Sequence, residues 1–267
     1  MLQYRDLKNA IHDLGVKRSE PTLVHASAAL IPQVKGGIQT MLGAILAGID
    51  NMLMPSFTFK TMLIPEIGPE ENLIEYGSGR EENLNASIFT PDLPADFEDQ
   101  AISEVFRHYP DVNRSNHPIL SFLGLGLDGA LQAQSTADPY GHIRYLLGKN
   151  AKVLLIGKDI SALFSIHACE QESGRKQFLR WAMTEEGIKE CPSFPGCSNG
   201  FHKVLFHLEG EVRQVTVQDQ PWYSFSLDSL TRTTLQLLRE DPYALLCNDL
   251  HCEKCNLIRK DIRQRRG

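Results

Sequence analysis

The chain has 267 residues, of which 42% are hydrophobic and 22% charged, so it can bury a full core as one domain or as two closely joined ones. Its net charge of -6 argues against a nucleic-acid partner, because proteins that bind a phosphate backbone gather Lys and Arg on one face. Apolar runs are too short to cross a bilayer, and charges stand where a secretory signal would be apolar. We therefore expect a cytoplasmic protein without a membrane partner.

The first part of the sequence alternates between helical and strand-like segments. Residues 4–15 place apolar side chains at helical spacing, and residues 22–25 form a short apolar strand. A helix is predicted over residues 36–46 and a strand over 51–55. Residues 60–98 are rich in Pro, Gly, Asn and acidic residues without a sustained period, which is typical of a functional loop.

The alternation continues in the second part of the sequence. We predict a helix over residues 101–107, a buried strand over 151–157 and a helix from about 165 to 175. Residues 204–208 and 212–217 read as two strands joined by a Glu-Gly-Glu turn, which predicts a hairpin.

Short strands that alternate with helices favour an α/β fold, a three-layer α/β/α sandwich whose ligands bind at the carboxyl ends of the strands. The late hairpin makes the sheet mixed. We predict a single domain over residues 1–267, with a long irregular loop at about 60–98 and a Cys-rich C-terminal tail at about 245–267.

The first cluster of chemically active residues follows the first predicted strand. His25 and Ser27 stand where that strand ends, a position that faces a crevice. Gly36 and Gly37 then allow close approach of the backbone to a ligand, and the following helix offers free amides to an anion such as a pyrophosphate. A glycine pair before a helix also makes an ordinary turn.

The second cluster packs a cation, a hydroxyl and an imidazole into an irregular segment, as Arg114, Ser115 and His117. Loops of this kind carry binding residues. The alternative is a solvated loop closed by Pro118.

The third cluster lies on the helix predicted after residue 157. His167 and Glu170 are three positions apart, so they share one helix face and the carboxylate can orient the imidazole. Such a pair suits a general base that removes a proton from an amine. The alternative is an ion pair on the surface of the helix.

Together these clusters form an ordered series of short motifs. The series is Val24-His25-Ala26-Ser27, Gly36-Gly37, Met54-Pro55-Ser56-Phe57-Thr58, Arg114-Ser115-Asn116-His117-Pro118 with Ser121-Phe122, Leu154-Leu155-Ile156-Gly157, His167 with Glu170, and Gly196-Cys197-Ser198-Asn199-Gly200-Phe201. In order and spacing it resembles the aminoglycoside 3-N-acetyltransferase family over roughly residues 20–205.

The resemblance implies an acetyltransferase that moves an acetyl group from acetyl-CoA to an amino group of an aminoglycoside or related amino sugar, and so a link to antibiotic resistance. It implies a fold distinct from that of the GCN5-related acetyltransferases. His167 matches the family's catalytic histidine, Glu170 the acid beside it and His25 a further histidine of the site. The residues that fall in segments lining the active cleft or the coenzyme site are Ser27, Gly36, Gly37, Arg114, Ser115 and His117.

The sequence departs from the family pattern at two places. Ser165 stands where the family usually has Thr, and His142 follows the Pro139-Tyr140-Gly141 segment where a Ser-Pro pair is commoner. The predicted loop carries a dense acidic run that would attract a polycationic amine or simply be solvated. This run consists of Glu66, Glu70, Glu71, Glu75, Glu81 and Glu82.

Six cysteines are expected to be thiols or metal ligands rather than disulfides. Cys252 and Cys255 form half of a zinc site, and Cys247 is a third candidate ligand. Cys191 and Cys197 are further candidates for closing the tetrahedron, and free thiols are the alternative. Cys169 points away from the face shared by the catalytic pair, which favours a buried apolar role.

Two other functions stay open from the sequence. One is a biosynthetic acetyltransferase for a non-antibiotic amine, and the other is a non-catalytic binding module stabilised by zinc. The identity of the amine cannot be read from the sequence, and a homodimer stays open.

Overall fold

The computed structural model describes residues 1–96, 100–208 and 210–266. The last residues of the predicted loop, the Glu209 position of the predicted turn and Gly267 of the predicted tail lie outside this part of the chain. Among the described residues, no helix has the length and apolar character that a membrane span requires.

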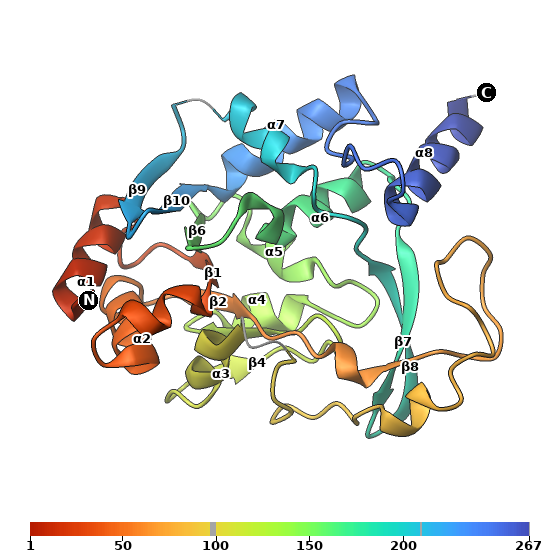
Figure 1. Ribbon diagram of the computed structural model, residues 1–267, viewed down its shortest axis with the longest axis horizontal. Coiled ribbons are helices and arrows are strands. Elements are labelled where there is room, and N and C mark those ends of the chain that lie inside the picture. The colour runs from red at the N-terminus through yellow and green to blue at the C-terminus, as the bar shows by residue number, and fades with distance from the viewer. Residues whose placement is uncertain (97–99, 209, 267) are drawn as a thin grey trace.

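A mixed sheet of seven strands forms the centre of the molecule (Figure 1). In spatial order its strands are β4 (Asn113–Arg114), β5 (Phe122–Leu125), β2 (Met52–Pro55), β1 (Thr22–Ala26), β6 (Lys152–Ile156), β10 (Gln220–Ser226) and β9 (Arg213–Val217). Strand β1 is parallel to both β2 and β6, and the outer pairings are antiparallel. The parallel centre brings the carboxyl ends of β1 and β6 to one edge, as the prediction of a mixed α/β sheet requires.

Helices cover both faces of this sheet because successive strand residues point to opposite sides. Leu23 packs into one core and Val24 into the other, and Leu155 and Ile156 divide in the same way. The helices of the Val24 side are α1 (Tyr4–Asp13), α2 (Gly37–Gly48) and α3 (Ala101–Arg107). The helices of the Leu23 side are α4 (Asp128–Ala133), α5 (Gly141–Leu146), α6 (Phe164–Glu172) and α7 (Leu227–Glu240). The three predicted layers are confirmed.

A second, antiparallel sheet projects from one end of the molecule (Figure 1). It consists of β3 (Met62–Leu63), β7 (Phe178–Thr184) and β8 (Gly187–Phe194), and the C-terminal helix α8 (Glu253–Arg266) lies near it. We did not predict this sheet. Lys189, Glu190 and Pro192 interrupt the apolar pattern of β8, which hides it from a search for alternating hydrophobic residues.

The predicted hairpin at 204–208 and 212–217 is wrong in its first arm. Residues Phe201–His207 form a 3-10 helix, η6, and β9 pairs instead with β10. In a strand, Val204, Phe206 and Leu208 would share one face, yet Val204 and Leu208 are buried while Phe206 is 72% exposed. The apolar residues therefore follow a helical rather than an alternating period.

Candidate active site

The predicted catalytic pair lies on α6, the helix that follows β6. Nδ1 of His167 lies 2.6 Å from Oε2 of Glu170, and both side chains are buried. Burial alone would raise the pKa of the Glu170 carboxyl group, but the hydrogen bond from His167 and the charges of His167 and Arg175 outweigh burial and lower it. The pair is thus an internal contact, and the alternative of a solvated ion pair on the helix surface is wrong.

Arg175 holds the second oxygen of this carboxylate. Its Nη1 donates to Oε1 of Glu170 at 2.6 Å, and its Nη2 donates to the carbonyl oxygens of Pro242 and Ala244 at 2.6 and 2.7 Å. We did not assign Arg175 from the sequence, although a cation shortly after the His-x-x-Glu pair was a signal for it. It keeps the buried carboxylate charged and in place.

Aromatic rings fix the orientation of the imidazole. The His167 ring packs edge-on against Phe201 at 4.8 Å between centroids and against Phe164 at 6.1 Å. Because Nδ1 is engaged by Glu170, Nε2 is the nitrogen left to exchange a proton with a substrate. The side chain keeps 7% of its surface exposed, so the ring is not sealed in the interior.

Three further histidines, His25, His117 and His142, are buried. His25, at the end of β1, has no partner for Nε2, and neither ring nitrogen of His142 has a partner among the described residues. Burial lowers the pKa of His25, His117 and His142 to about 3 each, and for His142 the neighbouring His117 and His25 add to the effect. His25 is a neighbour of His142, His142 lies against Phe164, and Phe164 contacts His167. His25 therefore lies in the same region as His167 and Glu170.

The other residues expected near the coenzyme fall into two groups, of which the first follows β1. Ser27 accepts a hydrogen bond from the Ala29 amide at 3.1 Å and begins a short 3-10 turn, η1 (Ala28–Gln33). Gly36 has φ 86°, a left-handed conformation that favours glycine, and Gly37 begins α2. This local geometry does not test whether Ser27, Gly36 and Gly37 contact the coenzyme, so these contacts stay predictions.

In the second group the polar atoms are already used inside the protein. Arg114 donates to Ser121 Oγ at 2.9 Å, to the Ser56 carbonyl at 2.7 Å and to carbonyls of the preceding loop. The Ser115 hydroxyl binds Gln134, and His117 Nδ1 accepts hydrogen bonds from two backbone amides. These contacts favour a structural role, in which Arg114 ties the segments around it together. Their contact with coenzyme stays a prediction.

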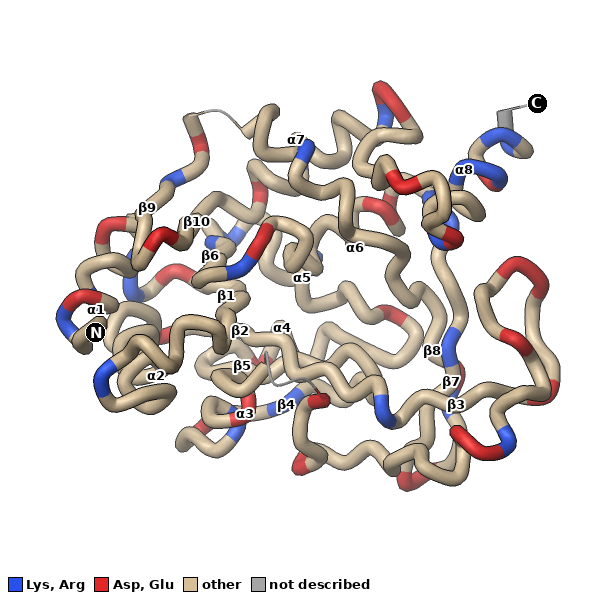
Figure 2. The backbone as a smooth tube through the Cα atoms, viewed as in Figure 1, with Lys and Arg blue, Asp and Glu red and all other residues tan. Residues whose placement is uncertain are grey.

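The acidic run lies along the loop between β3 and α3, at the right of Figure 2. Glu71 pairs with Lys260 of α8 and lies 4.0 Å from Lys176, so this carboxylate is committed to the protein. The exposed acids of the run are Glu66, Glu70, Glu75, Glu81 and Glu82.

Four of the six cysteines meet at one point, beside α8. The Sγ atoms of Cys197, Cys247, Cys252 and Cys255 all lie within 4.8 Å of one another. The three cysteines predicted as metal ligands are thus together, and the fourth is Cys197 rather than Cys191. Cys169 is buried in the core, in agreement with its predicted apolar role.

The model of the family described as aminoglycoside 3-N-acetyltransferase matches residues 23–239 of this chain. The chain belongs to the aminoglycoside 3-N-acetyltransferase family. It is 27% identical over 175 residues to aminoglycoside N(3)-acetyltransferase IX of Micromonospora chalcea, a match that covers 61% of this chain and 60% of that protein. The chain thus aligns with about 60% of the length of the first curated relative.

Solved structures share the fold of this chain. The YokD protein from Bacillus subtilis superposes with a TM-score of 0.76 at 21% identity, covering 90% of this chain and 94% of that one. AAC-IIIb, solved as a binary structure with CoASH, superposes with a TM-score of 0.70 at 16% identity, covering 90% of this chain and 97% of that one. At these sequence identities, the superpositions show that this chain and the two proteins share a fold.

Proposed function

We propose that this protein transfers an acetyl group from acetyl-CoA to an amino group of an aminoglycoside or related amino sugar, with His167 as the general base. The observation that carries the proposal is the buried contact of His167 with Glu170, whose carboxylate is held in turn by Arg175. A buried carboxylate on Nδ1 orients the ring and stabilises the imidazolium formed when Nε2 takes a proton. Family membership supports the same reaction.

The proposed reaction needs one proton acceptor and no covalent intermediate on the enzyme. The amine nitrogen attacks the thioester carbonyl carbon while His167 Nε2 removes its proton. The carbon–sulfur bond then breaks, and the coenzyme leaves as a thiol with the proton that His167 returns. His25 is neutral at physiological pH because burial lowers its pKa to about 3, so it can donate a hydrogen bond to the developing oxyanion without adding a charge.

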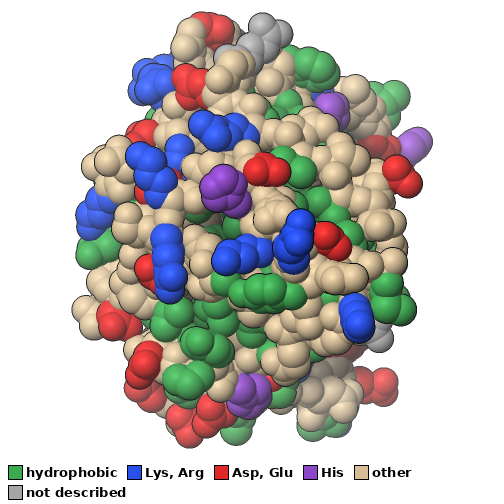
Figure 3. Space-filling view, turned by 90° about the vertical axis from the view of Figure 1, so that its left-hand side faces the viewer, with side chains coloured by type: hydrophobic (Ala, Val, Ile, Leu, Met, Phe, Trp, Pro, Cys, Tyr) green, Lys and Arg blue, Asp and Glu red, His purple; other side chains and the backbone are tan. Residues whose placement is uncertain are grey.

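Charge distribution supports the attraction of the two substrates to the protein. Figure 3 looks onto the end of the molecule that carries α1, α2 and β9, where Lys and Arg side chains gather near the middle of the face. This charge suits the phosphates of a coenzyme whose pyrophosphate lies near Gly36 and Gly37. The exposed glutamates of the loop that Figure 2 shows at the opposite end suit a polycationic amine.

The test is thiol release from acetyl-CoA in the presence of a panel of aminoglycosides and amino sugars, with the wild-type protein and the His167→Ala variant. The wild type should release coenzyme A with at least one amine, and the variant should lose on the order of 10²–10⁴ in turnover while its affinity for coenzyme A changes little. A variant that retains the full rate removes His167 from the base role.

The same panel separates the alternatives. Turnover with amino sugars but with no aminoglycoside would move the assignment to a biosynthetic acetyltransferase. If no amine is acetylated and coenzyme A does not shift the thermal unfolding of the protein, the result would favour a non-catalytic binding module.

A further inference from the structure

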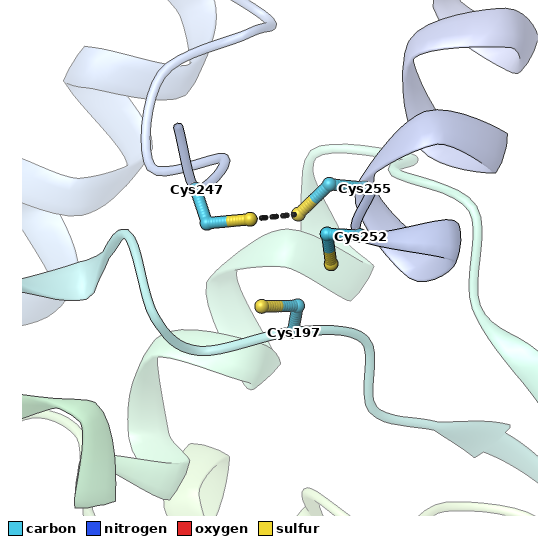
Figure 4. Close-up of side chains that lie close together, drawn as sticks. All are labelled: Cys197, Cys247, Cys252 and Cys255. Carbon is cyan, nitrogen blue, oxygen red and sulfur yellow. Dashed lines mark hydrogen bonds between the residues drawn. The ribbon is translucent and has the colours of Figure 1, made fainter. Parts of the chain in front are cut away.

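Four cysteines from three separate segments converge beside the C-terminal helix (Figure 4). Cys197 lies between β8 and η6, Cys247 follows α7, and Cys252 and Cys255 lie at the start of α8. All four are free thiols, and their sulfur atoms lie within 4.8 Å of one another, with 3.4 Å between Cys247 and Cys255. From this arrangement we propose that the four cysteines bind one Zn²⁺ ion as a structural site.

The geometry matches the ligand set that zinc prefers. Four thiolates about 2.3 Å from a metal form a tetrahedron whose edges are about 3.8 Å, which lies within the spread of the sulfur positions. The Cys252-x-x-Cys255 pair at a helix start supplies the usual close pair of ligands. The backbone amide of Asn199 also points at Cys197 Sγ, 3.5 Å away, and such amide contacts support metal-bound thiolates.

The proposed metal would join segments that otherwise share a small core. Among the described residues, the hydrophobic cluster around the cysteines adds only Leu246, Ile258 and Ile262 as buried members, and it is separate from the two cores that flank the main sheet. Polar contacts across it include Arg259 to the Cys247 carbonyl at 2.5 Å and Lys254 to the Gly196 carbonyl at 3.4 Å. A metal that binds all three segments would therefore add a strong link to α8, beside the contacts of Lys260 with Glu71 and of Arg265 with the Gly174 carbonyl.

Two of the three segments also support the catalytic pair. Four residues after Cys197 comes Phe201, whose ring packs against His167, and Cys247 follows the loop whose Pro242 and Ala244 carbonyls hold Arg175. Loss of the metal should therefore loosen Arg175 and Phe201 together. This effect on turnover rests on the proposed function, whereas metal binding does not depend on it.

The experiment begins with the metal content of the full chain, purified without chelators and measured by elemental mass spectrometry. We expect one zinc per chain, less than about 0.2 zinc in the Cys255→Ser variant, and unchanged zinc in Cys191→Ser. The two positions are matched, since Cys255 and Cys191 are exposed by 0% and 1% and only Cys255 belongs to the cluster. Cys255→Ser should also unfold at a temperature lower than that of Cys191→Ser by at least about 5 °C.

A second measurement protects the test against a variant that does not fold. In native wild-type protein, a thiol reagent and a chromogenic zinc indicator should report the release of one zinc as the cluster thiols react. Wild-type protein with no zinc, with iron in its place, or with a disulfide within the cluster would overturn the proposal, as would zinc retained in folded Cys255→Ser. Because metal content and thiol reactivity are read without acetyl-CoA, these outcomes are independent of the acetyltransferase assay.

Discussion

At the scale of single residues, the decisive arrangement is a carboxylate that contacts an imidazole with one oxygen and a guanidinium with the other. Glu170 accepts a hydrogen bond from Arg175 on one oxygen and contacts His167 with the other, and all three side chains are buried. Removing one partner of a buried ion pair leaves an uncompensated charge, which costs about 3–5 kcal/mol of stability. In the proposed reaction, Arg175 therefore has a positioning role, since it acts on His167 through Glu170.

The Glu170→Gln variant tests whether the negative charge at this position promotes proton transfer. Without the charge, the imidazolium of His167 loses its stabilising partner, so turnover should fall on the order of 10²–10⁴, with little change in the KM for acetyl-CoA. Steady-state kinetics measure both quantities. Glu172→Gln, on the same helix but exposed, should keep the wild-type rate, and a Glu170→Gln rate within about threefold of wild type would contradict the role.

At the scale of elements, the loop after α7 and the segment before η6 approach each other as closely as backbones allow. A Cβ atom at Gly200 would lie 2.2 Å from the Leu245 carbonyl oxygen, which only glycine avoids. This contact lies between Cys197 and Phe201 on one side and the carbonyl groups that hold Arg175 on the other. The fit of these two segments therefore affects the positions of His167, which contacts Phe201, and of Arg175, which these carbonyl groups hold.

Replacing Gly200 with Ala should separate the two segments. Because the new methyl group meets backbone that cannot rotate away, we expect a loss of about 1–3 kcal/mol in the free energy of unfolding, measured by urea denaturation. Gly43→Ala is the matched control. Gly43 lies in α2, and a Cβ atom there would come near one side chain, that of Tyr4 of α1, at 3.8 Å. That change should be neutral or stabilising by up to about 1 kcal/mol, and equal effects of the two changes would argue against the close packing at Gly200.

The same elements show how far the sequence predicts the structure. Strands β1, β2 and β6 and helices α1, α2, α3 and α6 were predicted to within a few residues, because each buries a continuous or regularly spaced apolar face. The β7–β8 hairpin was missed because its outer strand is half exposed. At the site, the spacing of His167 and Glu170 predicts only that the two side chains share a helix face, and the resemblance to the family implies their catalytic role. Arg175 and the partnership of Cys197 with the C-terminal cysteines depend on contacts between distant segments, which no local pattern shows.

At the scale of the whole molecule, buried neutral histidines link stability to pH. The unfolded chain binds protons at these rings below about pH 6.5, whereas the folded protein does not do so until about pH 3. Stability is therefore complete above pH 6.5 and falls as the pH decreases, by about 1.4 kcal/mol per unit for each ring. With His25, His117 and His142 all buried, the folded state should lose about 4 kcal/mol per pH unit in mildly acidic solution.

Replacing one of these rings tests the link directly. The His142→Leu variant removes a group whose pKa is lowered to about 3 by burial first, and then by His117, His25 and Arg144. Relative to wild type, the variant should lose about 1.4 kcal/mol less stability between about pH 7.5 and pH 5.5, because one fewer proton drives unfolding. Urea denaturation at the two pH values gives the difference.

The control is His12→Leu, at a side chain that is 88% exposed, which should keep the wild-type pH dependence. If His142→Leu behaves like His12→Leu, the ring at position 142 is already protonated or solvated in the folded protein, and its burial against Phe122 and Phe164 does not govern the response to acid.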